Sequence, residues 1–150
     1  MSTDLILAIA HHLAVFTLVG ILAAELAVLR RGFKGFRVAL LGTIDLFYGA
    51  SAALVLVAGF LRVFFGAVPA EYYLTYWVFW TKIGAFVIVG LLSLPPTLTI
   101  FRWRREALIN PEYSPADEGV LRIRRYLLAE VAVLALIPIL AAMMARGVFR

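Results

Sequence analysis

The chain has 150 residues, of which 64% are hydrophobic, and its mean hydropathy is +0.99. A soluble domain of this size is closer to half apolar, so the composition predicts an integral membrane protein. The net charge of +5 comes from basic residues between the apolar runs, which indicates membrane topology and argues against nucleic-acid binding, and the absence of cysteine excludes disulfides and thiolate chemistry.

Four apolar segments reach the roughly 20 residues that a helix needs to cross the hydrocarbon core of a bilayer. They cover about residues 5–29, 38–61, 76–101 and 126–145. We therefore expect an all-α integral membrane protein, a four-transmembrane-helix bundle that forms a single domain over residues 1–150 in contact with the lipid bilayer.

The basic residues predict the orientation of the bundle. Ten of the 14 flank the first and third loops: Arg30, Arg31, Lys34, Arg37, Arg102, Arg104, Arg105, Arg122, Arg124 and Arg125. Loops rich in lysine and arginine stay in the cytoplasm. We expect both termini on the periplasmic, outer side of a multi-pass protein of the bacterial inner membrane.

The first segment carries two adjacent histidines, His11 and His12, and a glutamate, Glu25. Adjacent residues of a helix point about 100° apart, so the two imidazoles face different directions. Glu25 follows His11 by fourteen positions, which returns to within roughly 40° of the same stripe. If Glu25 faces the interior, His11 does too, and His12 faces a neighbouring helix or the rim. The alternative for Glu25 is an ion pair with Arg30 or Arg37 near the interface.

The second segment has Asp45 toward the cytoplasmic side and Arg62 at the outer end. An ionisable residue inside a membrane is a candidate functional residue, although Arg62 can also extend its side chain to the interface. Three small residues on the same segment predict a stripe that allows another helix to approach closely: Gly49, Ala52 and Gly59.

The third segment carries Lys82 near its outer side, after an aromatic-rich stretch typical of a membrane interface. Pro95 and Pro96 remove two backbone donors late in this segment, so we expect either a kink or a break in the helix. The hydroxyls of Ser93 and Thr97 are placed to satisfy the carbonyls that the prolines leave free.

The fourth segment carries Glu130 toward the cytoplasmic side and Met144 fourteen positions further out. If Glu130 lies at the depth of Glu25, then Met144 lies at the depth of His11; its alternative role is ordinary apolar packing. The bundle is predicted to hold an outer layer of His11, His12, Arg62 and Lys82, and an inner layer of intramembrane carboxylates, Glu25, Asp45 and Glu130.

The outer layer suggests a haem site. The chain has none of the common nucleotide, nucleophile-elbow or zinc-protease motifs, and its two histidines are too few for a dihaem cytochrome. One haem b per protomer is feasible, with His11 as the axial metal ligand, Lys82 or Met144 opposite, and Arg62 beside the propionates. Two protomers of a homo-oligomer can also share a haem through their histidines.

Four stretches carry a resemblance to known proteins: "AHHLAVFTLVGILAAEL", "DLFYGASAALVLVAGFLRVFFG", "YYLTYWVFWTKIGAFVIVGLLSLPPT" and "FRWRR". Together they resemble a family of small bacterial membrane proteins of the DUF2214 type. More remotely, the chain is similar to HemJ-type protoporphyrinogen oxidases, in which a first-helix histidine and a later lysine take part in haem binding and porphyrinogen oxidation. That resemblance implies catalytic roles for His11 and Lys82.

Three functions follow from these features. The first is a haem-b-binding redox protein that acts on a quinone or a porphyrin. The second is a small transporter or channel that uses Asp45, Lys82 and Glu130. The third is an accessory subunit of a larger membrane complex, in which the charged side chains hold helices together.

Overall fold

The structure is a computed structural model that describes residues 3–148. Its elements in chain order are α1 (Thr3–Val28), the 3-10 helix η1 (Gly35–Arg37), α2 (Val38–Phe65), α3 (Ala70–Leu74), α4 (Trp77–Ile109) and α5 (Asp117–Ala145). Within the described residues, four of these helices are long and apolar enough to cross a membrane: α1, α2, α4 and α5. The prediction of an all-α bundle with four spans is confirmed.

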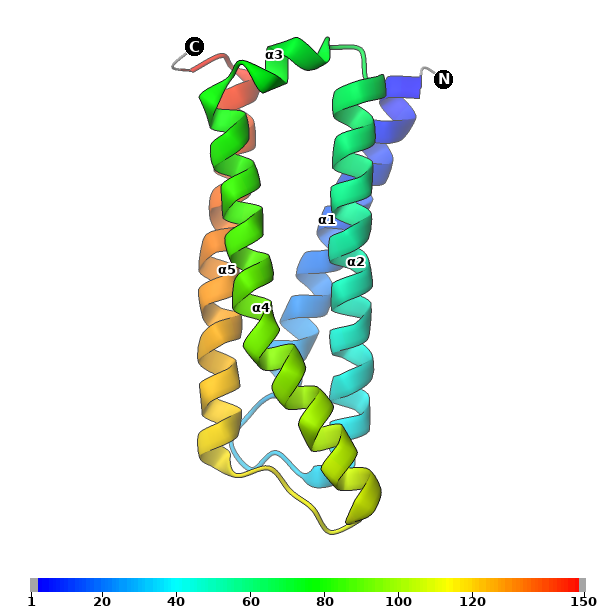
Figure 1. The fold of residues 1–150 in the computed structure, drawn as a ribbon, viewed down its shortest axis with the longest axis vertical. Helices are drawn as coiled ribbons and strands as arrows, with labels where there is room; N and C mark the ends of the chain where they lie inside the picture. The colour runs from blue at the N-terminus through cyan, green and yellow to red at the C-terminus, as the bar shows by residue number, and fades with distance from the viewer. Residues whose placement is uncertain (1–2, 149–150) are drawn as a thin grey trace.

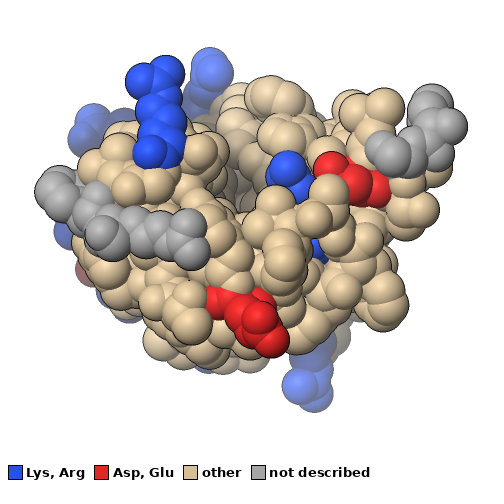
Figure 2. All heavy atoms as spheres, turned by 90° about the horizontal axis from the view of Figure 1, so that it is seen from above, with Lys and Arg blue, Asp and Glu red and all other residues tan. Residues whose placement is uncertain are grey.

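The four long helices form two hairpins. α1 packs along α2 and α4 packs along α5, while the hairpins meet each other mainly through α2 and α4. Both chain ends and α3 lie at one end of the bundle, here called the terminal end (Figure 1). The α1–α2 and α4–α5 loops lie at the opposite end, the loop end, where the two hairpins come together. Toward the terminal end they diverge, and the surface there is hollowed between them (Figure 2).

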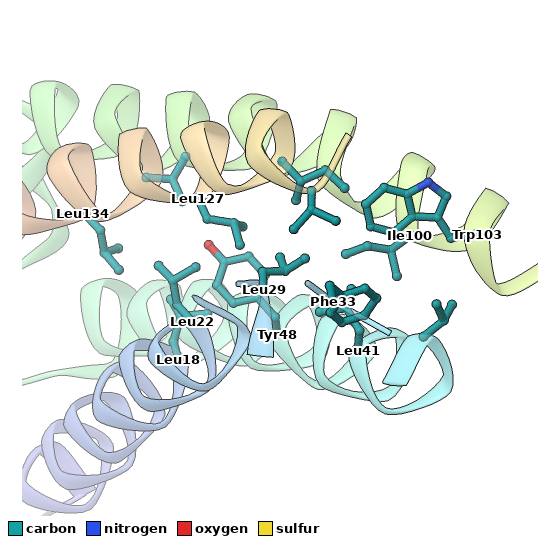
Figure 3. Close-up of a cluster of buried hydrophobic side chains, with 14 of the residues drawn as sticks. Leu18, Leu22, Leu29, Phe33, Leu41, Tyr48, Ile100, Trp103, Leu127 and Leu134 are labelled. Carbon is teal, nitrogen blue, oxygen red and sulfur yellow. The ribbon is translucent and has the colours of Figure 1, made fainter. Parts of the chain in front are cut away.

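The main apolar core fills the half of the bundle nearer the loop end. Figure 3 shows side chains from all four long helices meeting there, among them Leu22 from α1, Tyr48 from α2, Ile100 from α4 and Leu127 from α5. Large apolar residues on the outer faces remain exposed, as expected where lipid takes the place of water. A second, smaller cluster lies at the terminal end and consists of Val63, Tyr76, Val78, Phe79 and Met144.

The two loops at the loop end are hydrogen-bonded to each other. The backbone N–H of Gly35 donates to Ser114 Oγ at 2.9 Å, and that of Gly32 donates to Asp117 Oδ1 at 3.1 Å. Gly32 has φ of +72°, a conformation that favours glycine. A side chain at Gly35 would collide with the carbonyl of Tyr113, so only glycine allows the loops to approach this closely.

Hydrogen bonds also connect the elements at the terminal end. Asp4 Oδ1 accepts a hydrogen bond from the backbone N–H of Ala67 at 3.2 Å, which ties α1 to the loop after α2. The hydroxyls of Tyr72 and Tyr76 donate to the backbone carbonyls of Met144 and Val148, so the α3 region is anchored to the end of α5. The sequence did not predict α3.

Two helices extend beyond their predicted ends at the loop end. α4 continues past residue 101 to Ile109, and α5 begins at Asp117, before residue 126. Arginine is a good helix former, so the arginine-rich runs continue the helices outside the apolar region. Asp117 and Glu118 lie in the first turn of α5, where negative charge is favourable. At the other ends the differences are smaller: α1 is Thr3–Val28, and α2 continues to Phe65.

α4 remains helical through Pro95 and Pro96, and it changes direction near its middle (Figure 1). Proline removes an intrahelical hydrogen bond and bends the helix, so the kink occurs and the break does not. The expected role of Thr97 is wrong, because its hydroxyl donates to Asp45 Oδ1 on α2 at 2.8 Å. Ser93 Oγ donates to the carbonyl of Gly90, which is not one that the prolines free.

Candidate functional site

His11 is half-buried and packs against α2. A Cβ atom built on Gly59 would lie 3.3 Å from Cε1 of the imidazole, so the missing side chain of Gly59 makes room for the ring. The backbone carbonyl of Val55 lies near the ring, but the buried Nδ1 atom has no hydrogen-bond partner among the described residues. The structure therefore holds an inward-facing imidazole with one nitrogen left free in an apolar environment.

Two cations lie close enough to His11 for their charges to act on it, Lys82 from α4 and Arg62 from α2. Lys82 Nζ lies 5.6 Å from the centre of the Phe79 ring, within the range of a cation–π contact. Among residues 3–148, neither Lys82 nor Arg62 forms an ion pair. Three helices thus bring three basic groups together at the terminal end without an acidic partner, and we call His11, Arg62 and Lys82 the basic layer.

His12 faces away from this layer. Its side chain is exposed, and Nδ1 lies 2.6 Å from the carbonyl oxygen of Ala8 one turn earlier in α1. The two imidazole rings are 6.1 Å apart and nearly perpendicular. The expected helical geometry is present: of the two histidines, His11 shares the inward stripe with Glu25.

Met144 is buried in the cluster formed with Val63, Tyr76, Val78 and Phe79. Phe79 belongs to this cluster, and its ring is also the one that Lys82 Nζ approaches. The structure thus brings Lys82 toward His11 and places Met144 in apolar packing, the alternative that the sequence left open.

The inner carboxylates gather inside the bundle. Glu25 and Glu130 are fully buried, and Asp45 is 6% exposed. Glu130 Oε2 accepts a hydrogen bond from the hydroxyl of Tyr48 at 2.7 Å, while Oε1 has no partner. In Figure 3 the oxygen of Tyr48 points from α2 toward Leu127 on α5. The sequence reasoning missed Tyr48, although it lies one helical turn after Asp45 and therefore on the same face.

Neither oxygen of Glu25 has a hydrogen-bond partner among the described residues. The alternative considered for Glu25, an ion pair with Arg30 or Arg37, is not formed. The basic residue that reaches this part of α1 is Arg124 from α5, whose Nη1 donates to the carbonyls of Leu26 and Leu29 at 2.6 and 2.8 Å. Arginine is thus used to cap the end of α1, and the carboxylate of Glu25 is left unpaired.

The described residues contain no group of three or more histidine, aspartate and glutamate side chains arranged to hold a metal ion. The site instead has two separate parts, a basic layer at the terminal end and a carboxylate group nearer the loop end. Between them lies an apolar layer that includes Leu18, Val55, Val89 and Leu134.

These features define a four-span membrane bundle with ionisable groups at two depths. The chain belongs to the DUF2214 family, described as predicted membrane proteins, and the match covers residues 3–149. The resemblance noted from the sequence is thereby confirmed for this family. No curated protein and no solved structure matches the chain.

Proposed function

We propose that the basic layer binds haem b and that the protein is a membrane redox protein acting on a quinone or a porphyrin. The observation that carries the proposal is the free, buried Nδ1 of His11 beside two unpaired cations. Partly buried cations without counter-charges favour a ligand that brings negative charge, and an imidazole nitrogen would be a good ligand for iron. A haem has both features, since it carries iron and two propionates.

The residues of the basic layer have distinct roles in this proposal. His11 would bind the haem iron, and Gly59 leaves space for its ring. Arg62, near the end of α2, would offset the charge of the propionates. Lys82 would serve as a second ligand of the iron or would contact the porphyrin substrate, and Met144 would be a less favoured ligand. Bound haem would supply one-electron transfer, with its potential set by these ligands.

The hollow at the terminal end supports a ligand between the hairpins. There α1 and α2 diverge from α4 and α5 (Figure 1), and the surface is hollowed between them (Figure 2), so a ligand bound there would lie away from the core at the loop end. The same opening allows a homo-oligomer in which two protomers share one haem. In this proposal the terminal end faces the periplasm of a bacterial inner membrane, because the loop end carries most of the basic residues.

An absorption spectrum tests the proposal. Protein expressed with an adequate haem supply should show a Soret band, which His11→Ala should abolish and His12→Ala should retain. Lys82→Met should shift the band or weaken haem retention while the bundle still folds. The absence of a Soret band in the wild-type protein would defeat the haem proposal and favour a transporter or an accessory subunit. Loss of the band in His12→Ala alone would show that α1 is rotated about its axis.

A further inference from the structure

Outside the basic layer, Glu25 is the buried ionisable residue that the proposed haem site does not use. Its side chain is fully buried, and both carboxylate oxygens lack a hydrogen-bond partner among residues 3–148. An isolated charge in an apolar interior is very costly, and an unpaired ionisable residue within a membrane is a candidate functional residue. Glu25 therefore requires a bound species that neutralises it.

The groups that face Glu25 do not supply a positive charge. Asp45 from α2 and Glu130 from α5 lie close enough for their charges to act on it, and the Tyr48 hydroxyl donates a hydrogen bond to Glu130. Arg124 is engaged by the carbonyls at the end of α1. From α4, Thr97 donates to Asp45. Three carboxyl groups thus share one apolar region, and their mutual repulsion adds to the cost of charge there.

A proton fits this environment better than a metal ion. The described residues hold no group of acidic or histidine side chains arranged as a metal site, and a hard cation needs about six oxygen ligands at close distance. A proton needs only one oxygen, and it can be shared with a second one. Glu25 offers two free oxygens and Glu130 offers one.

Of the three carboxyl groups, Asp45 is the one that is not fully buried. It lies beside Gly42, Ile100, Phe101 and Arg104, on the side of the group nearer the loop end. In the other direction, the apolar layer with Leu18 and Val55 lies between Glu25 and His11. Polar side chains therefore continue from Glu25 toward the loop end, and apolar side chains continue toward the terminal end.

We propose that Glu25 and Glu130 form an intramembrane proton-binding site that exchanges protons with the loop end through Asp45. In each exchange Glu25 first gives its proton to the carboxylate of Asp45, which releases it toward the loop end. Asp45 then takes up a proton from outside and returns it to the carboxylate of Glu25, so both groups end in their original state. Tyr48 keeps Glu130 in place by its hydrogen bond. The site requires no bound haem, so either proposal can fail its test without affecting the other.

Infrared spectroscopy of the full chain in lipid nanodiscs tests the site. The wild-type protein should show the C=O band of a buried carboxylic acid at neutral pH. Glu25→Gln or Glu130→Gln should remove or reduce the band, and the matched control Glu112→Gln, at an exposed loop position, should leave it unchanged. Asp45→Asn should keep the band but slow its hydrogen–deuterium exchange on the order of tenfold.

Three outcomes would overturn the proposal: no band in the wild type, a band unaffected by both glutamate variants, or an exchange rate unaffected by Asp45→Asn. If the glutamate variants fail to fold, wild-type protein can be treated with a carbodiimide, which reacts with protonated carboxyl groups in apolar surroundings. Peptide mass spectrometry should then find the modification on Glu25 or Glu130 and not on exposed Glu112 or Glu118. Modification of neither buried residue would also contradict the proposal.

Discussion

The absence of a side chain at Gly59 leaves the space that the imidazole of His11 occupies. The sequence suggested that Gly59 belongs to a stripe for helix packing, and the structure places the imidazole of His11 against it. Gly49, assigned to the same stripe, is instead exposed and has no heavy atom within 4 Å of its built Cβ. Gly49 and Gly59 of α2 therefore provide a matched pair of positions.

We predict that Gly59→Val displaces the imidazole of His11 and destabilises the bundle. Overpacking of a fitted interior typically costs about 1–3 kcal/mol. Gly49→Val introduces the same side chain into open space on the same helix and should have little effect. Thermal unfolding in detergent, followed by circular dichroism, measures the difference. Equal melting temperatures for the two variants would show that the contact between Gly59 and His11 does not contribute to the stability of the bundle.

The inward position of His11 could be predicted because helical periodicity links it to Glu25, which is itself buried. The partners of the carboxyl groups could not be predicted in this way. Tyr48 bonds to Glu130 across 82 positions of sequence, and Thr97 bonds to Asp45 across 52. Such pairs depend on how the helices are rotated and placed against one another, which no local pattern specifies.

At the scale of elements, the end of α1 depends on a residue of α5. The last carbonyls of any helix lack intrahelical partners, and here two of them are satisfied by Arg124. Arg122, two positions earlier, is exposed and forms an ion pair at 3.3 Å with Glu118, which lies in the same helix. Arg124 joins the two hairpins, and Arg122 forms its ion pair within its own helix.

Arg124→Gln should therefore destabilise the protein more than Arg122→Gln. Hydrogen bonds from a charged donor contribute about 1.5–3 kcal/mol when they are partly shielded from water. An exposed ion pair contributes about 0.5 kcal/mol on average. Unfolding by denaturant in mixed micelles compares the two variants. A larger loss for Arg122→Gln would contradict the assigned role of Arg124.

The existence of the four spans could be predicted, because a bilayer requires long apolar helices. The residues at which these helices begin and end could not be predicted. The extension of α4 to Ile109 combines the helix propensity of its arginine-rich run with the packing of Trp103, whose buried ring lies 6.3 Å from that of Phe33. The short α3 depends on tyrosine hydroxyls that reach the end of α5. Hydropathy registers neither feature.

For the whole molecule, the two hairpins place both termini at one end and both basic loops at the other. This arrangement separates charge along the long axis of the bundle. The basic excess at the loop end predicts that this end lies in the cytoplasm.

Single cysteines test this orientation on a chain that has none of its own. We expect Thr3→Cys and Glu71→Cys to react with an impermeant thiol reagent in intact cells, and Lys34→Cys and Ala116→Cys to react only after the cells are permeabilised. Lys34 is exposed, whereas a side chain at neighbouring Gly35 would collide with Tyr113. The reverse labelling pattern would invert the orientation.

The division into hairpins also implies an order of assembly during synthesis. α1 and α2 pack mainly on each other, so they can enter the bilayer as a unit while α4 and α5 are still to be made. During that interval Glu25 and Asp45 are already within the membrane, but Arg124 and Glu130 do not yet exist. The nascent protein then has an uncapped helix end and an incomplete polar core. A chain that stalls at this stage leaves Asp45 inside the bilayer without Thr97, its partner from α4.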